Sequence, residues 1–175
     1  TDVTDPAQCQ HLVDTTVREC GGLDILINNA GVSAHANFED VPADKLAWYE
    51  QLMRVNLWGS IYCTHAAMPH LKQTQGRIVA LSSLAGLVGI PGRTAYCASK
   101  FAMTGFFEAL RIELKDSGVS VTVAYPGVVD TQIRRRGLNA MGETAGESGL
   151  REDHAMTTQE CARLIIYAMV RRKRE

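Results

Sequence analysis

Tyr96 and Lys100 have the residue types and the spacing for proton transfer. They stand four positions apart in Tyr-Cys-Ala-Ser-Lys, at the start of a segment with a helical pattern. Residues i and i+4 lie on one face of a helix, so the phenol and the ammonium can share a site. A free phenol has a pKa near about 10, and a neighbouring ammonium lowers that pKa because it favours the phenolate. The pair is therefore suited to moving a proton on or off an oxygen atom at neutral pH.

Ser83 lies thirteen positions before Tyr96, directly after the strand-like run 77–82, and a glycine-rich loop separates the two. Its hydroxyl could hydrogen-bond a carbonyl or alcohol oxygen. No side chain carries a hydride, whereas a nicotinamide cofactor does, and the residue spacing alone does not show that such a cofactor binds here. A bare Tyr-x-x-x-Lys is more often ordinary helix surface, and the functional interpretation depends on the surrounding motifs.

Three further motifs follow or adjoin the expected strands and helices. They are Asn28-Asn29-Ala30-Gly31, Asn56 in Arg-Val-Asn-Leu-Trp-Gly, and Pro126-Gly127-Val128-Val129-Asp130-Thr131. With Ser83, Tyr96 and Lys100, they make the chain resemble the short-chain dehydrogenase/reductase family. Within that family it looks closest to membrane-associated reductases acting on steroids, retinoids and other lipids, although bacterial ketoacyl reductases share the same core.

The resemblance implies catalytic roles for four residues. Tyr96 would be the general acid/base, and Lys100 would lower its pKa and hold the nicotinamide ribose. Ser83 would orient the substrate oxygen. Asn56 would hold a water that relays protons beside the lysine. A mid-helix asparagine is also often structural, because its amide competes for backbone hydrogen bonds.

The resemblance also implies a cofactor site for NAD(P)(H), with NADP(H) slightly preferred, to which Tyr96 and Lys100 contribute. Asp2 and Val3 would contact the adenine, and Asn28 the ribose side. Backbone near Val129 and the Thr131 hydroxyl would meet the nicotinamide amide. Two of these motifs also have a structural interpretation. The motif at 28–31 could be a simple turn after a strand, and the motif at 126–131 could end a strand and cap a helix.

Hydrophobic periodicity predicts alternating helices and strands. Strands are expected at 23–27, 77–81 and 119–125, and helices at 7–20, 42–72 with an interruption near Met53, 94–117 and 158–173. This order predicts an α/β fold, a Rossmann-type doubly wound parallel sheet with helices on both faces. Ligands should lie beyond the carboxyl ends of the strands, where each motif falls. The irregular stretch 131–157 is the expected substrate loop.

Residues 1–175 are expected to form one partial domain of the family fold. The family's glycine-rich turn is not found, so about two βαβ crossovers, and the first three strands, would precede Thr1. The strand at 23–27 would then have an open edge. The alternative hypothesis is a truncated or non-catalytic binding or scaffold module. The helices at 42–72 and 94–117 correspond to those that build homodimers or homotetramers in the family.

Composition restricts the remaining classes. A net charge of −1 gives no general attraction to nucleic acid, and 46% hydrophobic with 21% charged residues is ordinary for a globular protein. The five cysteines are scattered without metal-ligand spacing, which favours reduced thiols in a cytoplasmic or cytosol-facing protein. No segment predicts a membrane span, but an anchor preceding Thr1 stays an open alternative. The basic runs 134–136 and 171–174 suggest an acidic substrate group and lipid headgroups respectively, or plain surface charge.

Overall fold

Three parallel strands form one sheet in the order β1-β2-β3, with helices on both of its faces. The computed structural model describes residues 1–148 and 153–175. The α-helices and strands are α1 (Pro6–Cys20), β1 (Ile25–Asn28), α2 (Ala47–Met53), α3 (Gly59–Thr74), β2 (Arg77–Leu81), α4 (Thr94–Glu113), β3 (Ser120–Ala124) and α5 (Thr158–Val170). Short 3-10 turns lie at Phe38–Asp40, Ala43–Lys45 and Leu84–Gly86, and a π-helical turn at Arg54–Trp58. The predicted α/β Rossmann-type arrangement is confirmed.

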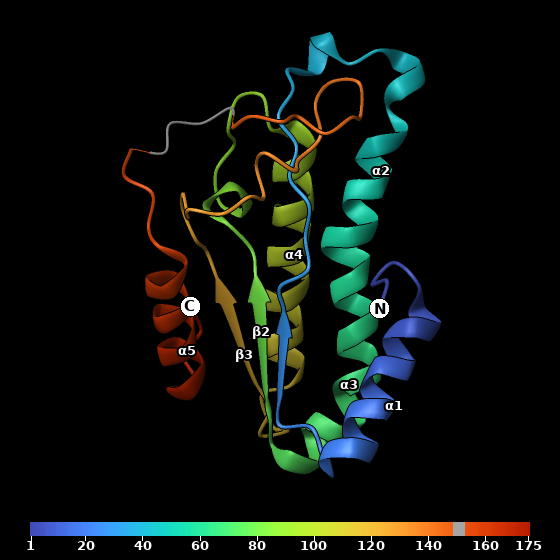
Figure 1. The fold of residues 1–175 in the computed structure, drawn as a ribbon. Helices are drawn as coiled ribbons and strands as arrows, with labels where there is room; N and C mark the ends of the chain where they lie inside the picture. Colours follow the sequence, from blue (N-terminus) through green and yellow to red (C-terminus); the bar gives the residue numbers. More distant parts are fainter. Residues whose placement is uncertain (149–152) are drawn as a thin grey trace.

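The three strands run in the same direction, so their carboxyl ends meet at one edge of the sheet. Ile25 pairs with Arg77, which in turn pairs with Ser120. Figure 1 shows the three arrows pointing the same way, with the connecting loops gathered beyond the arrowheads. It also shows α5 on the opposite side of the strands from α3. This edge is where a parallel sheet binds ligands.

Local signals set the ends of α1 where the sequence predicted them. The Asp5 carboxylate caps the helix by accepting from the Ala7 N–H at 2.8 Å, and Pro6 occupies the first turn. Gly21, at φ +78°, ends the helix in the left-handed conformation that glycine adopts without strain. Buried Val13 packs this helix into the main core.

The long helical segment after residue 42 is continuous rather than interrupted. It starts with the 3-10 turn Ala43–Lys45, continues as α2, and passes through the π-helical turn into α3. The helix was predicted to break near Met53. Instead it continues through this region with one π-helical turn. Such turns mostly occur as single insertions within α-helices and frequently at functional sites. This one carries Asn56.

The sheet is buried unevenly. The middle residues of β2 and β3 are buried and join the main core with α3 and α4. On β1, Ile25 and Ile27 are 39% and 47% exposed. β1 is the open edge that the sequence predicted at this position.

Several predicted boundaries were wrong by a few residues: β3 is Ser120–Ala124 rather than 119–125, and α3 continues to Thr74 rather than 72. The first strand occupies Ile25–Asn28 rather than 23–27, and α4 stops at Glu113 rather than 117 because Ser117 closes a turn on the Leu114 carbonyl. α5 ends at Val170 rather than 173 because the following residues bond to β3. The Val123 N–H donates to the Arg174 carbonyl at 2.9 Å, and the Thr122 hydroxyl donates to the Lys173 carbonyl at 2.6 Å.

Candidate active site

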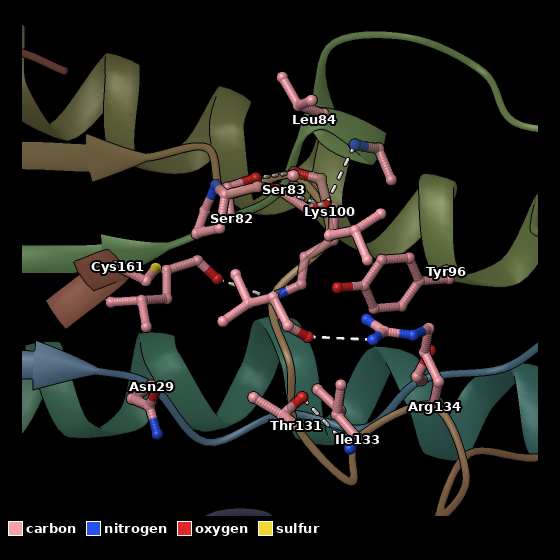
Figure 2. Close-up of a pocket in the computed structure, with 18 of the residues that line it drawn as sticks. Asn29, Ser82, Ser83, Leu84, Tyr96, Lys100, Thr131, Ile133, Arg134 and Cys161 are labelled. Carbon is pink, nitrogen blue, oxygen red and sulfur yellow. Dashed lines mark hydrogen bonds between the residues drawn. The ribbon is translucent and has the colours of Figure 1, made fainter. Parts of the chain in front are cut away.

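A cavity of about 390 Å³ opens at the carboxyl edge of the sheet. Loops after all three strands line it, together with the first turns of α4 and of α5 (Figure 2). Its lining includes Ser83, Tyr96, Lys100, Val129 and Thr131 among the residues singled out from the sequence. It does not include Asp2, Val3, Asn28 or Asn56. Among the described lining residues, the aliphatic ones are Val32, Leu81, Leu84, Ala85, Ile90, Val128, Val129, Ile133, Ala162 and Ile165.

Tyr96 and Lys100 lie on the first two turns of α4 and face the cavity together. Their residues are 8% and 5% exposed, and the Lys100 Nζ is 5.8 Å from the centre of the Tyr96 ring. The Lys100 ammonium donates to the Leu81 carbonyl at 2.7 Å, which fixes it beside the end of β2. Burial lowers the pKa of Lys100 to about 8.

The pKa of Tyr96 departs from the sequence-based expectation. Burial raises it above its ordinary value, and this outweighs the opposing effects of the Arg93 cation and a hydrogen bond with Ser83. A weaker opposing effect comes from Arg134. The predicted lowering by Lys100 is therefore not what governs this phenol, because the ammonium is itself buried and bonded to a carbonyl. Tyr96 is a protonated phenol at neutral pH.

Ser83 occupies the turn between β2 and α4. Its Oγ accepts from the Ala85 N–H at 3.2 Å and donates to the Pro126 carbonyl at 3.4 Å, so it caps the short turn Leu84–Gly86. In Figure 2 it lies on the opposite side of Lys100 from Arg134. The weak bond to Pro126 leaves the hydroxyl able to turn toward a ligand oxygen.

Asn56 is fully buried behind the cavity and acts as a brace between segments. Its Oδ1 accepts from the Val32 N–H at 2.8 Å, and its Nδ2 donates to the Val32 carbonyl at 3.0 Å and to the Ser99 hydroxyl at 2.9 Å. The Ser99 hydroxyl donates to the Tyr96 carbonyl at 2.8 Å. Both amide hydrogens are thus in use, so Asn56 has no side-chain donor left for a relay water. These bonds suit it to position the segments around it, and its predicted relay water stays a prediction.

The two asparagines after β1 have different roles. Asn28 is buried and its Nδ2 donates to the Thr64 hydroxyl at 3.0 Å, which ties β1 to α3. Its neighbour Asn29 lines the cavity instead. The residue of this motif that lines the cavity is therefore Asn29, and the predicted contact of Asn28 with the ribose side of the cofactor stays a prediction.

Asp2 and Val3 lie away from the cavity. The Asp2 carboxylate accepts from the Thr4 N–H at 2.9 Å and from the Thr4 hydroxyl at 2.8 Å. Val3 contacts Gly59, and its carbonyl accepts from the buried Cys9 thiol. Their predicted adenine contacts concern a different part of a dinucleotide and stay a prediction.

Sequence reasoning missed Arg93, which lines the cavity three positions before Tyr96. Its guanidinium carbon lies 4.5 Å from the centre of the Tyr96 ring. Arg93 is the N-cap of α4, with φ −132° and ψ 30°, so it lies outside the regular helix and helical spacing alone does not place it beside Tyr96. The structure also divides the basic run 134–136: Arg134 lines the cavity, whereas Arg135 and Arg136 are exposed. The sequence analysis also did not single out Cys161 and Ile165, which line the cavity from α5.

A family model described as short chain dehydrogenase matches residues 1–141. The chain belongs to the short-chain dehydrogenase family. Among curated proteins it is 37% identical, over 98% of its length, to 11-beta-hydroxysteroid dehydrogenase-like 4A of Arabidopsis thaliana, covering 55% of that protein. It is 42% identical, over 75% of its length, to 11-beta-hydroxysteroid dehydrogenase-like 3 of the same plant, covering 42%. The chain thus spans about half the length of the curated relatives it matches.

Solved structures agree on the fold of this short-chain dehydrogenase chain. An alcohol dehydrogenase from the archaeon Thermococcus sibiricus, complexed with 5-hydroxy-NADP, superposes with a TM-score of 0.78 over 97% of the chain and 66% of its own, at 20% identity. ElxO with NADP bound superposes with a TM-score of 0.70 over 75% of the chain and 53% of its own, at 29% identity.

The described residues contain no group of three or more His, Cys, Asp or Glu side chains placed to hold a metal ion. Within residues 1–148 and 153–175, no helix is both long and apolar enough to cross a membrane.

Proposed function

We propose that the protein is an oxidoreductase that interconverts an alcohol and a carbonyl compound with NAD(P)(H). The observation that carries this proposal is the convergence of Ser83, Tyr96 and Lys100 on one cavity at the carboxyl edge of a parallel sheet. They come from the β2 loop and from α4, and share one family's sequence motif. The relatives named as hydroxysteroid dehydrogenases support the same reaction class.

The cavity residues fit the nicotinamide end of such a cofactor. Among described partners, the Lys100 Nζ contacts only the Leu81 carbonyl and the Met103 sulfur, which leaves donor capacity toward the cavity. A Cβ on Gly31 would lie 3.2 Å from the Asn56 Oδ1 and 3.9 Å from the Lys100 Nζ, so a side chain at this position would crowd Asn56 and lie against Lys100. Lys100 would hold the ribose, with Val129 and Thr131 at the carboxamide. The bound cofactor supplies or accepts the hydride.

Tyr96 performs the proton transfer in this proposal. In the reducing direction, its protonated phenol donates to the substrate oxygen as the adjacent carbon becomes an alcohol carbon. In the oxidising direction, the phenolate takes the proton from the alcohol. Ser83 holds the oxygen through its hydroxyl, and Asn56 keeps Tyr96 in place through Ser99. The raised pKa of Tyr96 in the free protein is consistent with a phenol that acts as the proton donor in the reducing direction.

Replacing Tyr96 by Phe tests the assignment. The variant should lose at least about 10²-fold in kcat because it removes the only proton donor proposed, while the fold and the affinity for NADPH persist. Tyr167→Phe is the matched control, since Tyr167 is 51% exposed on α5 and does not line the cavity. Turnover close to that of the unchanged protein in Tyr96→Phe would refute the role.

Separate titrations with NADH and NADPH, followed by nicotinamide fluorescence, test the cofactor and decide between an enzyme and a non-catalytic module. We propose NADP(H) as the preferred form, because both structural neighbours carry NADP or a derivative of it. Saturable binding supports the enzyme. A folded protein that binds neither form would support the binding or scaffold module.

Replacing Asp2 by Ala should weaken binding of the whole dinucleotide if Asp2 and Val3 contact the adenine.

Assembly and location are part of the same proposal. We infer a homodimer or homotetramer through 42–72 and 94–117, because Trp58, Phe101 and Ile112 are 46%, 46% and 65% exposed on these helices. Light scattering should then give a mass above that of one chain. All five cysteines are free thiols, which supports a cytoplasmic or cytosol-facing location. The net charge of −1 gives no general attraction to a nucleic-acid partner.

A further inference from the structure

Arg93 is a buried cation in the wall of the cavity. It precedes the first turn of α4, is 6% exposed, and stacks on the Tyr96 ring. Its Nη2 donates to the buried Ser33 hydroxyl. Its Nε is buried and has no hydrogen-bond partner among the described residues. A guanidinium has five N–H donors, so most of this one's capacity is unused within the described chain.

The charge of Arg93 also lacks a counter-ion. No Asp or Glu of the described residues lies within salt-bridge distance of it, whereas Arg111 and Arg174 both pair with Glu108. Burial lowers the pKa of Arg93, and repulsion from the Arg134 cation lowers it further. A buried cation without a partner is unfavourable, and an anion that enters the cavity would relieve this.

The cavity as a whole is suited to an anion attached to an apolar body. Its described lining includes three cationic side chains, Arg93, Lys100 and Arg134, and none of its described lining residues is Asp or Glu. Figure 2 shows the Arg134 guanidinium beside the Tyr96 ring. That guanidinium donates to the Val129 carbonyl at 3.0 Å, which holds it at the cavity wall. The rest of the described lining is largely aliphatic and includes Leu84, Ile133 and Ile165.

We propose that the substrate carries a carboxylate, which Arg93 binds next to the carbonyl or alcohol that reacts at Tyr96. The proposal rests on the oxidoreductase function above and names its substrate class: oxo acids, or the corresponding hydroxy acids, with an apolar remainder. A planar guanidinium held in place by Ser33 and the Tyr96 ring matches a carboxylate through two parallel N–H bonds. The carboxylate contributes to substrate recognition by Arg93 and takes no part in the redox step.

The test compares acids with their own methyl esters in the intact protein. Benzoylformate, 3-benzoylpropionate and 4-benzoylbutyrate place a carboxylate at increasing distance from a ketone, and each phenyl ring suits the apolar wall. At least one acid should exceed its ester in kcat/KM by about tenfold or more, the effect of one charge-assisted hydrogen bond. If esters are reduced and no acid is preferred, the carboxylate proposal is wrong and the oxidoreductase function stands.

The variants assign the preference to one side chain. Arg93→Gln should lower the acid-to-ester ratio by about tenfold, and this ratio cancels any effect of Arg93 on Tyr96 that both substrates share. Arg135→Gln is the matched control: it removes the same charge at an exposed position and should leave the ratio unchanged. Arg93→Lys keeps the charge without the planar fork and should lower the ratio by a smaller factor. If Arg93→Gln does not fold, the acid-to-ester ratios of Arg93→Lys and of the unchanged protein still test the proposal.

A binding measurement separates failure of this proposal from failure of the function. Ligand-observed NMR with 3-benzoylpropionate and its ester needs no turnover. Selective acid binding that Arg93→Gln weakens supports the carboxylate site even if no ketone is reduced. Equal binding of acid and ester overturns it. A variant whose affinity for NADPH falls while its acid-to-ester ratio stays constant also overturns it, since Arg93 would then serve the cofactor phosphates.

Discussion

Opposite walls of the cavity are built in different ways. The α4 wall holds Tyr96 and Lys100 on a regular helix, which is braced from behind by the buried bonds of Asn56 in the π-helical turn. The wall after β3 follows irregular backbone from Pro126 to Arg134. In the proposed function, the first wall carries the groups for proton transfer, and the second carries groups that would contact the nicotinamide carboxamide and the body of a substrate.

This contrast implies that changes in the α4 wall act on stability and rate together, because the same bonds that fold the segment also aim its side chains. Changes in the wall after β3 should alter affinity and leave the rate constant unchanged. Four substitutions test this distinction, from the largest expected effect to the smallest.

Gly86→Ala should be the most damaging change, because the turn after β2 packs directly on α4. A Cβ at this position would lie 2.8 Å from the Lys100 carbonyl and also clash with Ser82. We expect a loss of about 3 kcal/mol in the free energy of unfolding, with lower activity as Ser83 shifts. Gly89→Ala in the same loop is the control, since a Cβ there meets no described atom within 4 Å. Urea denaturation with equal midpoints for the two variants would contradict the expectation.

Asn56→Ala should remove the brace and cost about 2 kcal/mol in stability. It leaves the Val32 amide and carbonyl and the Ser99 hydroxyl short of partners inside the protein. The kcat should fall as well, because Ser99 bonds to the Tyr96 backbone. Asn37→Ala, at an exposed asparagine, should change neither quantity appreciably. A variant that keeps full stability but loses activity would instead favour the relay role.

Lys100 should make stability depend on pH in a defined window. Its pKa is about 8 in the folded protein and near about 10.4 in an unfolded chain, so between these values the unfolded chain binds more protons. The free energy of unfolding should therefore rise by up to about 2 kcal/mol between pH 8 and 10. That stability is lost as the pH falls back through 8. Lys100→Met should flatten the profile in denaturation curves across this range, and exposed Lys72→Met should not. A slope that persists in Lys100→Met would exclude this cause.

Ile133→Ala should have the smallest effect. Ile133 lines the cavity and is 37% exposed, so its removal takes away part of an apolar contact worth about 1 kcal/mol. The KM of an apolar ketone should rise a few-fold while kcat stays constant. Met141→Ala, at an exposed position outside the cavity, provides the comparison in steady-state kinetics. A large drop in kcat would show that the wall after β3 also positions the reacting groups.

The sequence predicted the α4 wall better than the wall after β3, for a physical reason. Tyr96 and Lys100 are related by helical spacing, and Ser83 by its place at a strand end, so local rules locate all three. Arg93 is the N-cap of α4 and lies outside the regular helix, and its burial depends on its contacts with Ser33 and with the Tyr96 ring. The different roles of Asn28 and Asn29 depend on α3, and no periodicity encodes the division of the run 134–136. The Asn56 brace required knowing that Val32 and Ser99 would be its neighbours.

The parallel sheet has a consequence for how the protein folds. Each strand pairs with one that is remote in sequence, and the Asn56 bonds join residues 24 and 43 positions apart. Such contacts require large loops to close before they contribute any stability, which makes folding slow compared with helical bundles. The catalytic groups can come together only after those closures. On dilution from denaturant, helical circular dichroism should recover first, and enzymatic turnover should return with the slowest refolding phase.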